Sequence, residues 1–570
     1  MKPRNKAAGV LHFLVIPCCF LLLTCFNPLN YNNKTTLNVT FSAESEEFNA
    51  KAAANPEDIR CTLDFSGPEK QRFSRTVGIG ERISLGAAPG RWYISANAYL
   101  SGKLYATGAE ATEVKEGQKN NVNIKLRLLS VSDANGTPPP PSTPPPAPVT
   151  STPSVSISGT AMYNETLTAV TSGFTGSSPS YEWYVGGSLT AISTSSYTIV
   201  NSSDRTKQIY VEVTDTVTGE NSASPPLTIH KALPVNNESE LSDIGNTALY
   251  TLGEDYILRA NITLTGPFIP IGNGSTFTGT FDGDGHYIDL GYNNISSTTI
   301  YGLQVFGLFG YIDGATAEVK NLKLTGTIII PSTLATANYA GGLTGVNGGT
   351  IKNVASEIII DTPSPADNPI SAGGIAGWND PDGIIEDCSY IGNISLDTSG
   401  YVTGNPLAGG IAGETYGIIL RCLASGTVST IVTNLNEKAG GICGYITKAS
   451  MPPAIIENCV ALNSIIQVGG LVFGTYYGRI VGHEDAFGNT QLTNNYANSG
   501  MTVIVNSLPV SVTGTSGDLH GQDFTSSGQS AWTGPGTPGW TIHPLIDGDE
   551  THPWVWDSTA IPPRPKLWFN

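Results

Sequence analysis

Short apolar runs alternate with glycine and polar turns through the second half of the chain, without the spacing of an amphipathic helix. Between residues 307 and 482 a Gly-Leu/Ile-x-Gly phrase keeps returning, at steps of 35, 32, 36, 31 and 30 residues. Its closing glycines are Gly310, Gly345, Gly377, Gly413, Gly444 and, in a looser copy, Gly474. Self-similarity at a period of about 20–50 residues is typical of a solenoid.

Two more strand-like runs follow most copies of the phrase. After Gly377 they are Ile385-Glu386-Asp387-Cys388 and residues 392–396. Three short strands joined by glycine turns predict one coil of a parallel β-helix. Neighbouring coils would pair through parallel backbone hydrogen bonds about 4.8 Å apart, so that equivalent residues stack on one another.

The apolar residues of the second run lie three positions apart, whereas a straight strand would point such a pair to opposite faces. A bend between them would turn both inward and place a polar residue at a corner of the coil. The corner residues would be Asn321, Asn353, Asp387 and Asn458. We expect a partial asparagine ladder there that satisfies buried backbone groups, with plain surface turns as the alternative.

Cys388, Cys422 and Cys459 occupy the same place in successive copies, 34 and 37 residues apart. Stacked in a β-helix, they would form an interior column of small apolar side chains. A disulfide between adjacent coils and a metal site are the alternatives, although a vertical column does not surround an ion tetrahedrally. We therefore interpret the three cysteines and the closing glycines as structural positions.

Residues 1–24 have the pattern of a signal peptide, in which three basic residues precede an uncharged apolar run. The run ends in Leu-Leu-Leu-Thr24-Cys25, which resembles the relaxed lipobox of spirochaete lipoproteins. The resemblance implies lipidation of Cys25, a membrane anchor and a tether at 25–34. Simple secretion is the alternative.

Three segments separate this leader from the repeats. Residues 35–130, with strand-like runs such as 92–96, predict a small β-sandwich, and the prolines of 131–153 predict a semi-rigid linker. Residues 154–230 carry Glu-Thr-Leu-Thr, Tyr-Glu-Trp-Tyr and Val-Glu-Val-Thr phrases that resemble bacterial immunoglobulin-like modules. Because no cysteine lies between 61 and 388, Trp183 would have to hold this core by packing alone.

Residues 231–482 resemble bacterial surface proteins with GLUG-motif repeats. The resemblance rests on a capping segment, a Phe-x-Gly-x-Phe-Asp-Gly-x-Gly-His phrase at 277–286 and at least five Gly-Leu-x-Gly copies. It implies a right-handed parallel β-helix, expected over 231–510, on an exported protein suspected of adhesion. Some relatives sit on zinc peptidases, but here His483-Glu484 has Phe487 where a second His ligand is needed. The sequence therefore holds no zinc peptidase motif.

Five of the eight tryptophans lie in the last segment, 511–570. The open end of a solenoid exposes apolar residues and strand edges, so we predict that this segment is a C-terminal cap. A sugar-stacking platform is the alternative, because aromatic rings also bind the apolar faces of pyranoses. Asp282 and Asp284 are calcium candidates in a glycine-rich turn, for which a purely structural turn is the alternative.

The net charge of −18, without a basic stripe, argues against nucleic acid as a partner. No motif indicates a cofactor or a catalytic constellation. We therefore expect an all-β lipoprotein of a bacterial envelope, in the outer membrane or at the cell surface, in which two small β-sandwiches and a proline stalk carry the β-helix. Its expected function is non-catalytic, as an adhesin or ligand-binding protein for a host or matrix protein or a glycan, with specificity carried by inserts such as 362–367 and 450–453. The alternatives are a carbohydrate-active β-helix enzyme, a carbohydrate-binding protein, and a structural role in the envelope.

Overall fold

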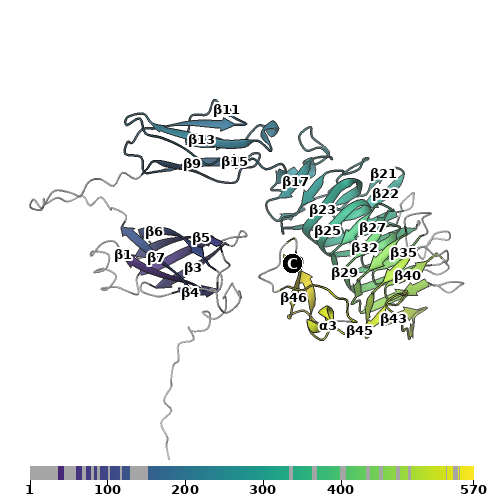
Figure 1. The fold of residues 1–570 in the computed structure, drawn as a ribbon. Coiled ribbons are helices and arrows are strands. Elements are labelled where there is room, and N and C mark those ends of the chain that lie inside the picture. Colours follow the sequence, from purple (N-terminus) through teal and green to yellow (C-terminus); the bar gives the residue numbers. More distant parts are fainter. Residues whose placement is uncertain are drawn as a thin grey trace, which may run out of the picture. The chain divides into compact units, whose positions relative to one another are not determined.

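The computed structural model is nearly all β, with 54% strand and 3% helix, and residues 280–505 form a β-solenoid of about 6 turns. The prediction of an all-β chain with a parallel β-helix is confirmed (Figure 1). The chain divides into two compact units, 1–146 and 147–570. The structure describes residues 36–43, 59–66, 72–78, 83–86, 90–100, 103–115, 119–128, 152–332, 338–362, 369–397, 406–431, 437–447, 453–469, 476–485, 490–534, 536–543, 550 and 552–569.

Several predicted features lie outside the described residues. They are the signal peptide, Cys25, the tether at 25–34, nearly all of the linker at 131–153, and most of the two inserts proposed to carry specificity. Within the described ranges, no helix is long and apolar enough to span a membrane.

The first unit is a seven-stranded sheet in the order β3-β2-β5-β6-β7-β1-β4. Its strands are β1 (Thr36–Ala43), β2 (Ile59–Ser66), β3 (Arg72–Gly78), β4 (Ile83–Gly86), β5 (Gly90–Leu100), β6 (Lys103–Val114) and β7 (Lys119–Leu128). Strands β1 and β7 pair in parallel, and the other pairs are antiparallel. Trp92, Ile94 and Ala96 alternate along β5 and are buried, as the two-residue period of a strand requires.

The second unit begins with two antiparallel sheets, β11-β10-β13-β14 with β15 added to β13, and β12-β9-β8. Their elements are β8 (Ser154–Ser158), β9 (Thr166–Ser172), β10 (Pro179–Val185), β11 (Ser188–Leu189), β12 (Ser196–Thr198), the 3-10 helix η2 (Ser202–Asp204), β13 (Gln208–Asp215), β14 (Asn221–Ala223) and β15 (Leu227–Thr228). Trp183 is fully buried in the shared core, and its Nε1 donates to the Thr194 carbonyl at 2.9 Å. This ring therefore fills a core that contains no cysteine, as predicted.

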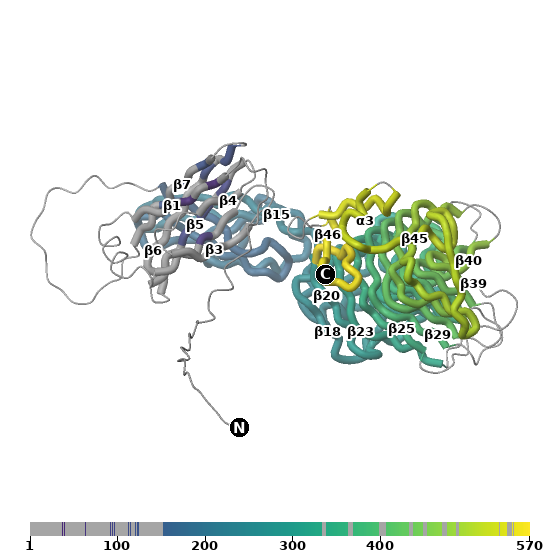
Figure 2. The backbone as a smooth tube through the Cα atoms, turned by 90° about the horizontal axis from the view of Figure 1, so that it is seen from below, coloured from purple at the N-terminus to yellow at the C-terminus, as the bar shows by residue number. Residues whose placement is uncertain are grey.

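The solenoid follows, and its coils stack along one axis (Figure 2). Its elements are β16 (Leu233–Val235), α2 (Glu238–Asp243), β17 (Asp255–Leu258), β18 (Ile262–Thr263), β19 (Thr280–Asp282), β20 (Tyr287–Tyr292), β21 (Thr298–Ile300), β22 (Leu303–Phe306), β23 (Phe309–Ile329), β24 (Asn338–Gly341), β25 (Thr344–Asp361), β26 (Ile370–Gly373), β27 (Ala376–Asn379), β28 (Ile384–Glu386), β29 (Ser389–Asp397), β30 (Leu407–Gly409), β31 (Ala412–Thr415), β32 (Ile418–Leu420), β33 (Leu423–Ile431), β34 (Lys438–Gly440), β35 (Cys443–Ile446), β36 (Ile455–Glu457), β37 (Val460–Ala461), β38 (Ile465–Val468), β39 (Tyr476–Gly478), β40 (Val481–Glu484), β41 (Gln491–Thr493), β42 (Tyr496–Asn498), β43 (Thr502–Val505), β44 (Leu508–Val510) and β45 (Gln522–Phe524). Equivalent strands of successive coils pair in parallel, so equivalent residues lie in columns.

The Gly-Gly-Ile phrase forms a bend between two short strands, so a coil contains four strand segments, such as β26, β27, β28 and β29. Its isoleucines point inward, and Ile411 is fully buried. Its closing glycines lie where a Cβ would come within 2.5–2.6 Å of a neighbouring atom; they are Gly310, Gly345, Gly377, Gly413 and Gly444. At Gly377, Gly413 and Gly444 the neighbouring atoms include backbone of an adjacent coil, which leaves no room for a side chain; at Gly310 the nearest atom is the tip of Ile300.

The sixth copy of the phrase is Gly478-Arg479-Ile480-Val481-Gly482, because Gly478 pairs with Gly440. This corrects the looser copy that the sequence suggested at 469–474. Arg479 occupies a position that is glycine in the preceding coils, where a side chain would strike the next coil. Here the side chain extends over the end of the stack and donates to the carbonyls of His520 and Gly521.

The predicted corner is confirmed. Its residues adopt left-handed backbone with φ between 48° and 56°: Asn321, Asn353, Asp387, Arg421, Asn458 and Asn494. Asparagine and aspartate tolerate this conformation better than other non-glycine residues. Asn353 Nδ2 donates to Asn321 Oδ1 at 3.1 Å, and Asn494 Nδ2 donates to Asn458 Oδ1 at 2.6 Å. The ladder is therefore partial, as predicted, but these side chains bond to one another and to the tail rather than to the backbone of their own turn.

The interior cysteine column is also confirmed. Cys388, Cys422 and Cys459 are fully buried free thiols in successive coils. Burial raises the pKa of the Cys422 and Cys459 thiols well above the usual value, so the column is apolar and uncharged. Residues that directly follow the column, such as Leu423 and Val460, point outward.

The end cap predicted for 511–570 is correct for residues 511–524 and wrong for the tryptophan-rich part of the tail, which covers one wall of the solenoid. Its elements are α3 (Ser530–Thr533), β46 (Trp554–Asp557) and β47 (Arg564–Leu567). Trp532, Trp540 and Trp554 pack against the outward-facing Leu423 and Val460. In Figures 1 and 2 the tail runs back along the coils, and a Cβ on Gly285, near the first coil, would meet Trp568 at 3.2 Å. Residues 508–524 cover the last coil instead, since Ile480 donates to the Leu519 carbonyl.

Candidate functional site

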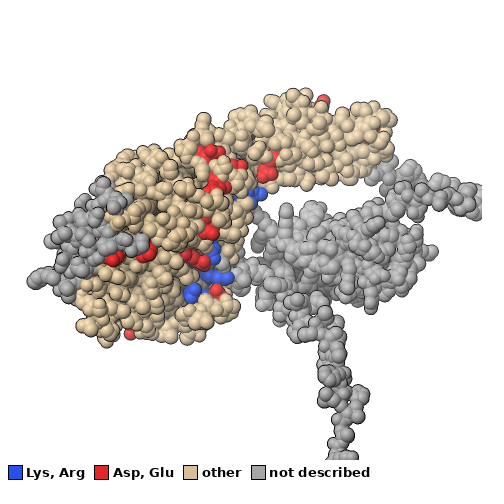
Figure 3. All heavy atoms as spheres, turned by 180° about the vertical axis from the view of Figure 1, so that it is seen from behind, with Lys and Arg blue, Asp and Glu red and all other residues tan. Residues whose placement is uncertain are grey.

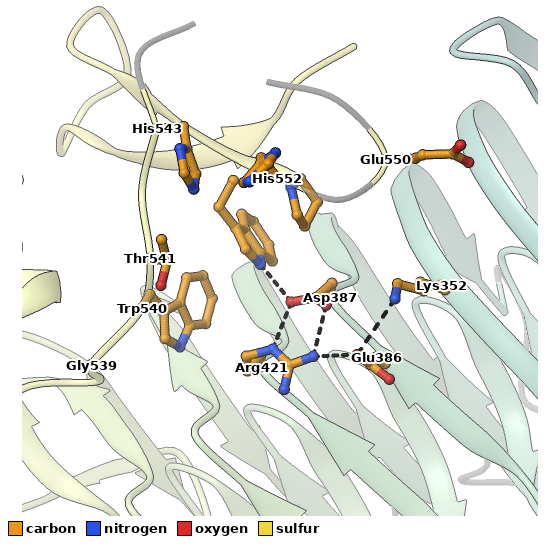
Figure 4. A pocket seen from close by; sticks show the side chains of 12 residues that line it. Lys352, Glu386, Asp387, Arg421, Gly539, Trp540, Thr541, His543, Glu550 and His552 are labelled. Carbon is orange, nitrogen blue, oxygen red and sulfur yellow. Dashed lines mark hydrogen bonds and ion pairs between the residues drawn. The ribbon is translucent and has the colours of Figure 1, made fainter. Parts of the chain in front are cut away.

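A cavity of about 380 Å³ opens between the corner column and the tail (Figure 4). The solenoid lines one side with Lys352, Glu386, Asp387 and Arg421. The tail lines the other with Gly539, Trp540, Thr541, His543, Glu550, His552, Pro553 and Trp554. The cavity thus brings together acids, bases and aromatic rings that are up to 202 residues apart in the chain, from 352 to 554.

The solenoid charges in this cavity are paired with one another. Arg421 donates from Nε and Nη2 to the two oxygens of Asp387 at 2.9 and 2.8 Å, and it also contacts Glu386. Lys352 Nζ lies 3.7 Å from Glu386 Oε1. The hydrogen bonds with Asp387 raise the pKa of Arg421. Trp554 Nε1 adds a hydrogen bond to Asp387 Oδ1 at 2.9 Å, so the tail is bound directly to this ion-pair cluster.

This geometry fits a joint between the tail and the solenoid better than a catalytic centre. A catalytic carboxylate must be free to reach its substrate, whereas Glu386 and Asp387 are engaged by Arg421 and Glu550 lies 3.6 Å from Lys320. Among the described residues, no group of three or more His, Cys, Asp or Glu side chains is arranged to hold a metal ion. Three of the five tail tryptophans, Trp532, Trp540 and Trp554, are 0–2% exposed and therefore unavailable to a sugar, whereas Trp556 and Trp568 are half-buried.

Charged side chains gather in one band on the face of the second unit that Figure 3 shows, and most of the remaining visible surface carries none. Asp282, Lys320, Lys352 and Glu386 follow one another in a register column. Lys320 lies 3.8 Å from Asp282 and 3.5 Å from Glu318. The two acids and the two lysines of this column compensate each other, so the column offers no strong field to a charged partner.

The calcium candidates lie at the start of this column. Asp282 accepts hydrogen bonds from the Asp284 backbone at 2.9 Å and from Asn321 Nδ2 at 3.0 Å. Arg259 lies 3.6 Å from Asp284, which adopts left-handed backbone with φ 49°. Burial and the neighbouring Asp282 raise the pKa of Asp284. These contacts are those of a turn held by its own hydrogen bonds and ion pairs.

A second candidate site lies on a different wall and was not anticipated from the sequence. Rings from successive coils form what we call the aromatic band: Tyr311, Tyr339, Trp378, Tyr416, Tyr445, Tyr476 and His483. Each of these side chains is half-buried, so part of each ring faces solvent. Tyr311, Trp378, Tyr445 and His483 belong to one register column, and Tyr339 and Tyr476 belong to a neighbouring one.

The rings of the band lie close to one another along the solenoid. The Trp378 centroid is 5.5 Å from that of Tyr339 and 5.8 Å from that of Tyr416. At the other end, His483 lies 3.8 Å from Tyr476 and 5.7 Å from Tyr445. The column spans six coils, or five steps of about 4.8 Å, so the band is about 24 Å long.

Polar groups lie between the rings. Asp380 accepts from the Tyr311 hydroxyl at 2.6 Å, and Glu414 accepts from Thr447 Oγ1 at 2.6 Å. Burial raises the pKa of both carboxyls, which keeps protons on them to a higher pH than usual. Lys438 is 6% exposed, and its ammonium lies 4.3 Å from the centre of the Tyr445 ring. Burial lowers the pKa of this lysine.

A weak signal for the band does exist in the sequence. An aromatic residue directly follows the closing glycine in four copies of the phrase, at Tyr311, Trp378, Tyr445 and His483. The position after the closing glycine lies on the outside of the coil. Tyr339 and Tyr476, however, come from a different strand of the coil, so the spacing of the phrase does not show that they lie beside the first column. Only the folded coil brings the two columns together.

Comparison with known proteins gives a fold resemblance only. No family model matches the chain, and no curated protein matches it. The crystal structure of a candidate immunoglobulin A1 protease from Bacteroides ovatus matches 52% of this chain and 84% of that one, with 20% identity and a TM-score of 0.39. A structure described as an IgA1 protease matches 79% of this chain and 29% of that one, with 12% identity and a TM-score of 0.33. At these values the resemblance does not extend to activity.

Proposed function

We propose that this chain is a non-catalytic ligand-binding protein of a bacterial envelope, anchored through a lipid at Cys25, which acts as an adhesin. The β-helix would serve as a rigid display, with the two N-terminal β-domains and the proline linker holding it away from the membrane. The observation that carries the proposal is the aromatic band. Half-buried rings with polar groups between them are the composition expected of a binding surface.

Packing of the tail supports this choice of wall. The tail fills the wall that carries Leu423 and Val460, so that wall is engaged within the chain itself. The aromatic band follows β27, β31, β35 and β40, on a different side of the coil from β46 (Figure 1). Half-buried rings on a wall that the tail leaves uncovered favour an external ligand.

One observation favours a carbohydrate-active enzyme as the second candidate. Asp380 and Glu414 come from adjacent coils, and burial raises the pKa of both carboxyls, as glycoside-cleaving acids require. Each carboxylate, however, already accepts hydrogen bonds from its neighbours, including Tyr311 and Thr447 respectively. We therefore assign these acids to holding the band in place.

Adhesion is tested by coating beads with the secreted full-length protein and measuring their binding to host cells, matrix proteins and immobilised glycans. Saturable binding above that of uncoated beads is expected, with no release of reducing ends from the glycans. Absence of binding to all three surfaces would contradict the proposed function. Release of reducing ends that is lost in Glu414→Gln would replace it with the enzyme.

A further inference from the structure

We propose that the aromatic band is a binding site for an extended, neutral glycan that lies along the solenoid axis. The inference rests on the proposed function and gives it a ligand class and a location. It concerns the wall with Trp378 at its centre, not the cavity under the tail.

The spacing of the rings fits a chain of pyranoses. Trp378 lies 5.5 and 5.8 Å from its two neighbours, Tyr339 and Tyr416, which come from the coils on either side. An extended β-linked glycan advances by about the length of one sugar ring per residue, close to the coil step of about 4.8 Å. A glycan parallel to the axis would therefore meet an aromatic group repeatedly. The Tyr339 and Trp378 planes lie 33° apart, so both can contact the apolar C–H faces of sugars, whereas the Trp378 and Tyr416 planes lie 61° apart, so one of these two rings would meet the glycan by its edge.

Polar groups of the band match sugar hydroxyls. The carboxylates of Asp380 and Glu414 provide acceptors between the rings. Apolar faces with a few directed polar groups are typical of small-molecule and sugar sites.

The acidic side chains around the aromatic band favour neutral glycans over acidic ones. Asp380, Glu414 and Asp485 surround the band, and Asp485 accepts from the Tyr445 hydroxyl at 2.7 Å. Lys438 lies over the Tyr445 and Tyr476 rings, at 4.3 and 5.6 Å, so its cation is already held by aromatic faces. The net charge of −18 adds to this acidity. An acidic polysaccharide would be repelled, and a neutral one would not.

The same composition distinguishes a glycan from a protein partner. A protein interface needs a contiguous apolar core of some hundreds of Å², surrounded by a polar rim. The band is narrow and long, and acids interrupt it at Asp380 and Glu414. A linear polymer that contacts one ring per step uses such a strip more fully than a compact protein surface does.

The test measures binding of the full chain to hexasaccharides of β-1,4-glucose, β-1,3-glucose, β-1,4-xylose and β-1,4-mannose, and to polygalacturonate, by isothermal titration calorimetry. We expect at least one neutral hexasaccharide to bind and polygalacturonate not to bind. Trp378→Ala and Tyr416→Ala should each weaken binding about tenfold or more, and Trp378→Phe should restore part of it. Tyr292→Ala is the matched control, because Tyr292 is 76% exposed and lies outside the band.

Thermal unfolding of each variant distinguishes loss of the site from loss of the fold, and Tyr416→Ala stands in for a Trp378→Ala chain that fails to fold. Glycan binding that is unchanged in both alanine variants overturns the inference. Binding to matrix protein or cells without binding to any neutral hexasaccharide overturns the inference and leaves the adhesin intact. Absence of binding to cells, matrix proteins and glycans overturns the proposed function itself.

Discussion

Removing the Trp554 side chain should release the tail from the solenoid wall. The ring is 2% exposed, lies 4.4 Å from the Trp540 ring, and donates from Nε1 to Asp387 at 2.9 Å. Truncation of a buried aromatic side chain to alanine costs about 3–5 kcal/mol. Trp554→Phe keeps most of the apolar area and loses the bond to a charged group, so it should cost about 1.5–3 kcal/mol.

Native-state hydrogen exchange is the appropriate assay, because a chain with several domains need not unfold in one step and the tail opens locally. Each loss of about 1.4 kcal/mol in the free energy of opening speeds exchange tenfold. A loss of about 3 kcal/mol or more in Trp554→Ala should therefore make exchange in β46 and β47 about a hundredfold faster or more. Trp556→Ala is the control: Trp556 is a neighbouring but partly exposed side chain, so its removal should accelerate exchange in β46 and β47 far less. Unchanged exchange in β46 and β47 of Trp554→Ala would show that Trp554 does not hold the tail on the solenoid wall. Equal acceleration in the solenoid strands would show that the tail is not a separable element.

Three further predictions concern other parts of the chain. Gly410→Ala should destabilise the solenoid by about 1–3 kcal/mol, because the new Cβ would lie 2.2 Å from the Gly441 carbonyl oxygen. Gly266→Ala is the control: a Cβ there has no atom within 4 Å, so the thermal unfolding midpoint should stay nearly unchanged. Equal midpoints for the two variants would contradict this. Burial lowers the pKa of His520 below its usual value of 6.5, so below pH 6.5 the unfolded chain binds a proton more readily than the folded chain and stability falls with the pH. The unfolding midpoint should therefore fall more between about pH 7.5 and about pH 5.5 in the wild type than in His520→Gln. Parallel curves for the two proteins would contradict this. Cys25→Ser should abolish incorporation of labelled palmitate, and unchanged labelling would show that Cys25 is not the lipidation site.

The coil and its corner could be predicted from the sequence because both are set by local, repeated constraints. A three-residue spacing such as that of Ile385 and Cys388 forces a bend, and the residue at the bend must adopt left-handed backbone. Because every coil has the same bend, the residues that form it recur at a regular spacing in the sequence. Arg421 is the exception: it adopts the same conformation with φ 48° and is held there by its two bonds to Asp387.

The repeating interior of this protein can be predicted from local sequence pattern: the glycine bends, the buried isoleucines and the column of Cys388, Cys422 and Cys459. What covers the outside depends on how the folded coils and the tail come together. The tail packs on a wall because outward-facing side chains of separate coils, including Leu423 and Val460, combine into one apolar surface. The aromatic band arises in the same way, from two columns that meet only when the coil closes. Interior positions repeat because the side chains of each coil must fit those of the next. Exterior positions repeat less closely, because they pack against other parts of the chain, which differ from coil to coil.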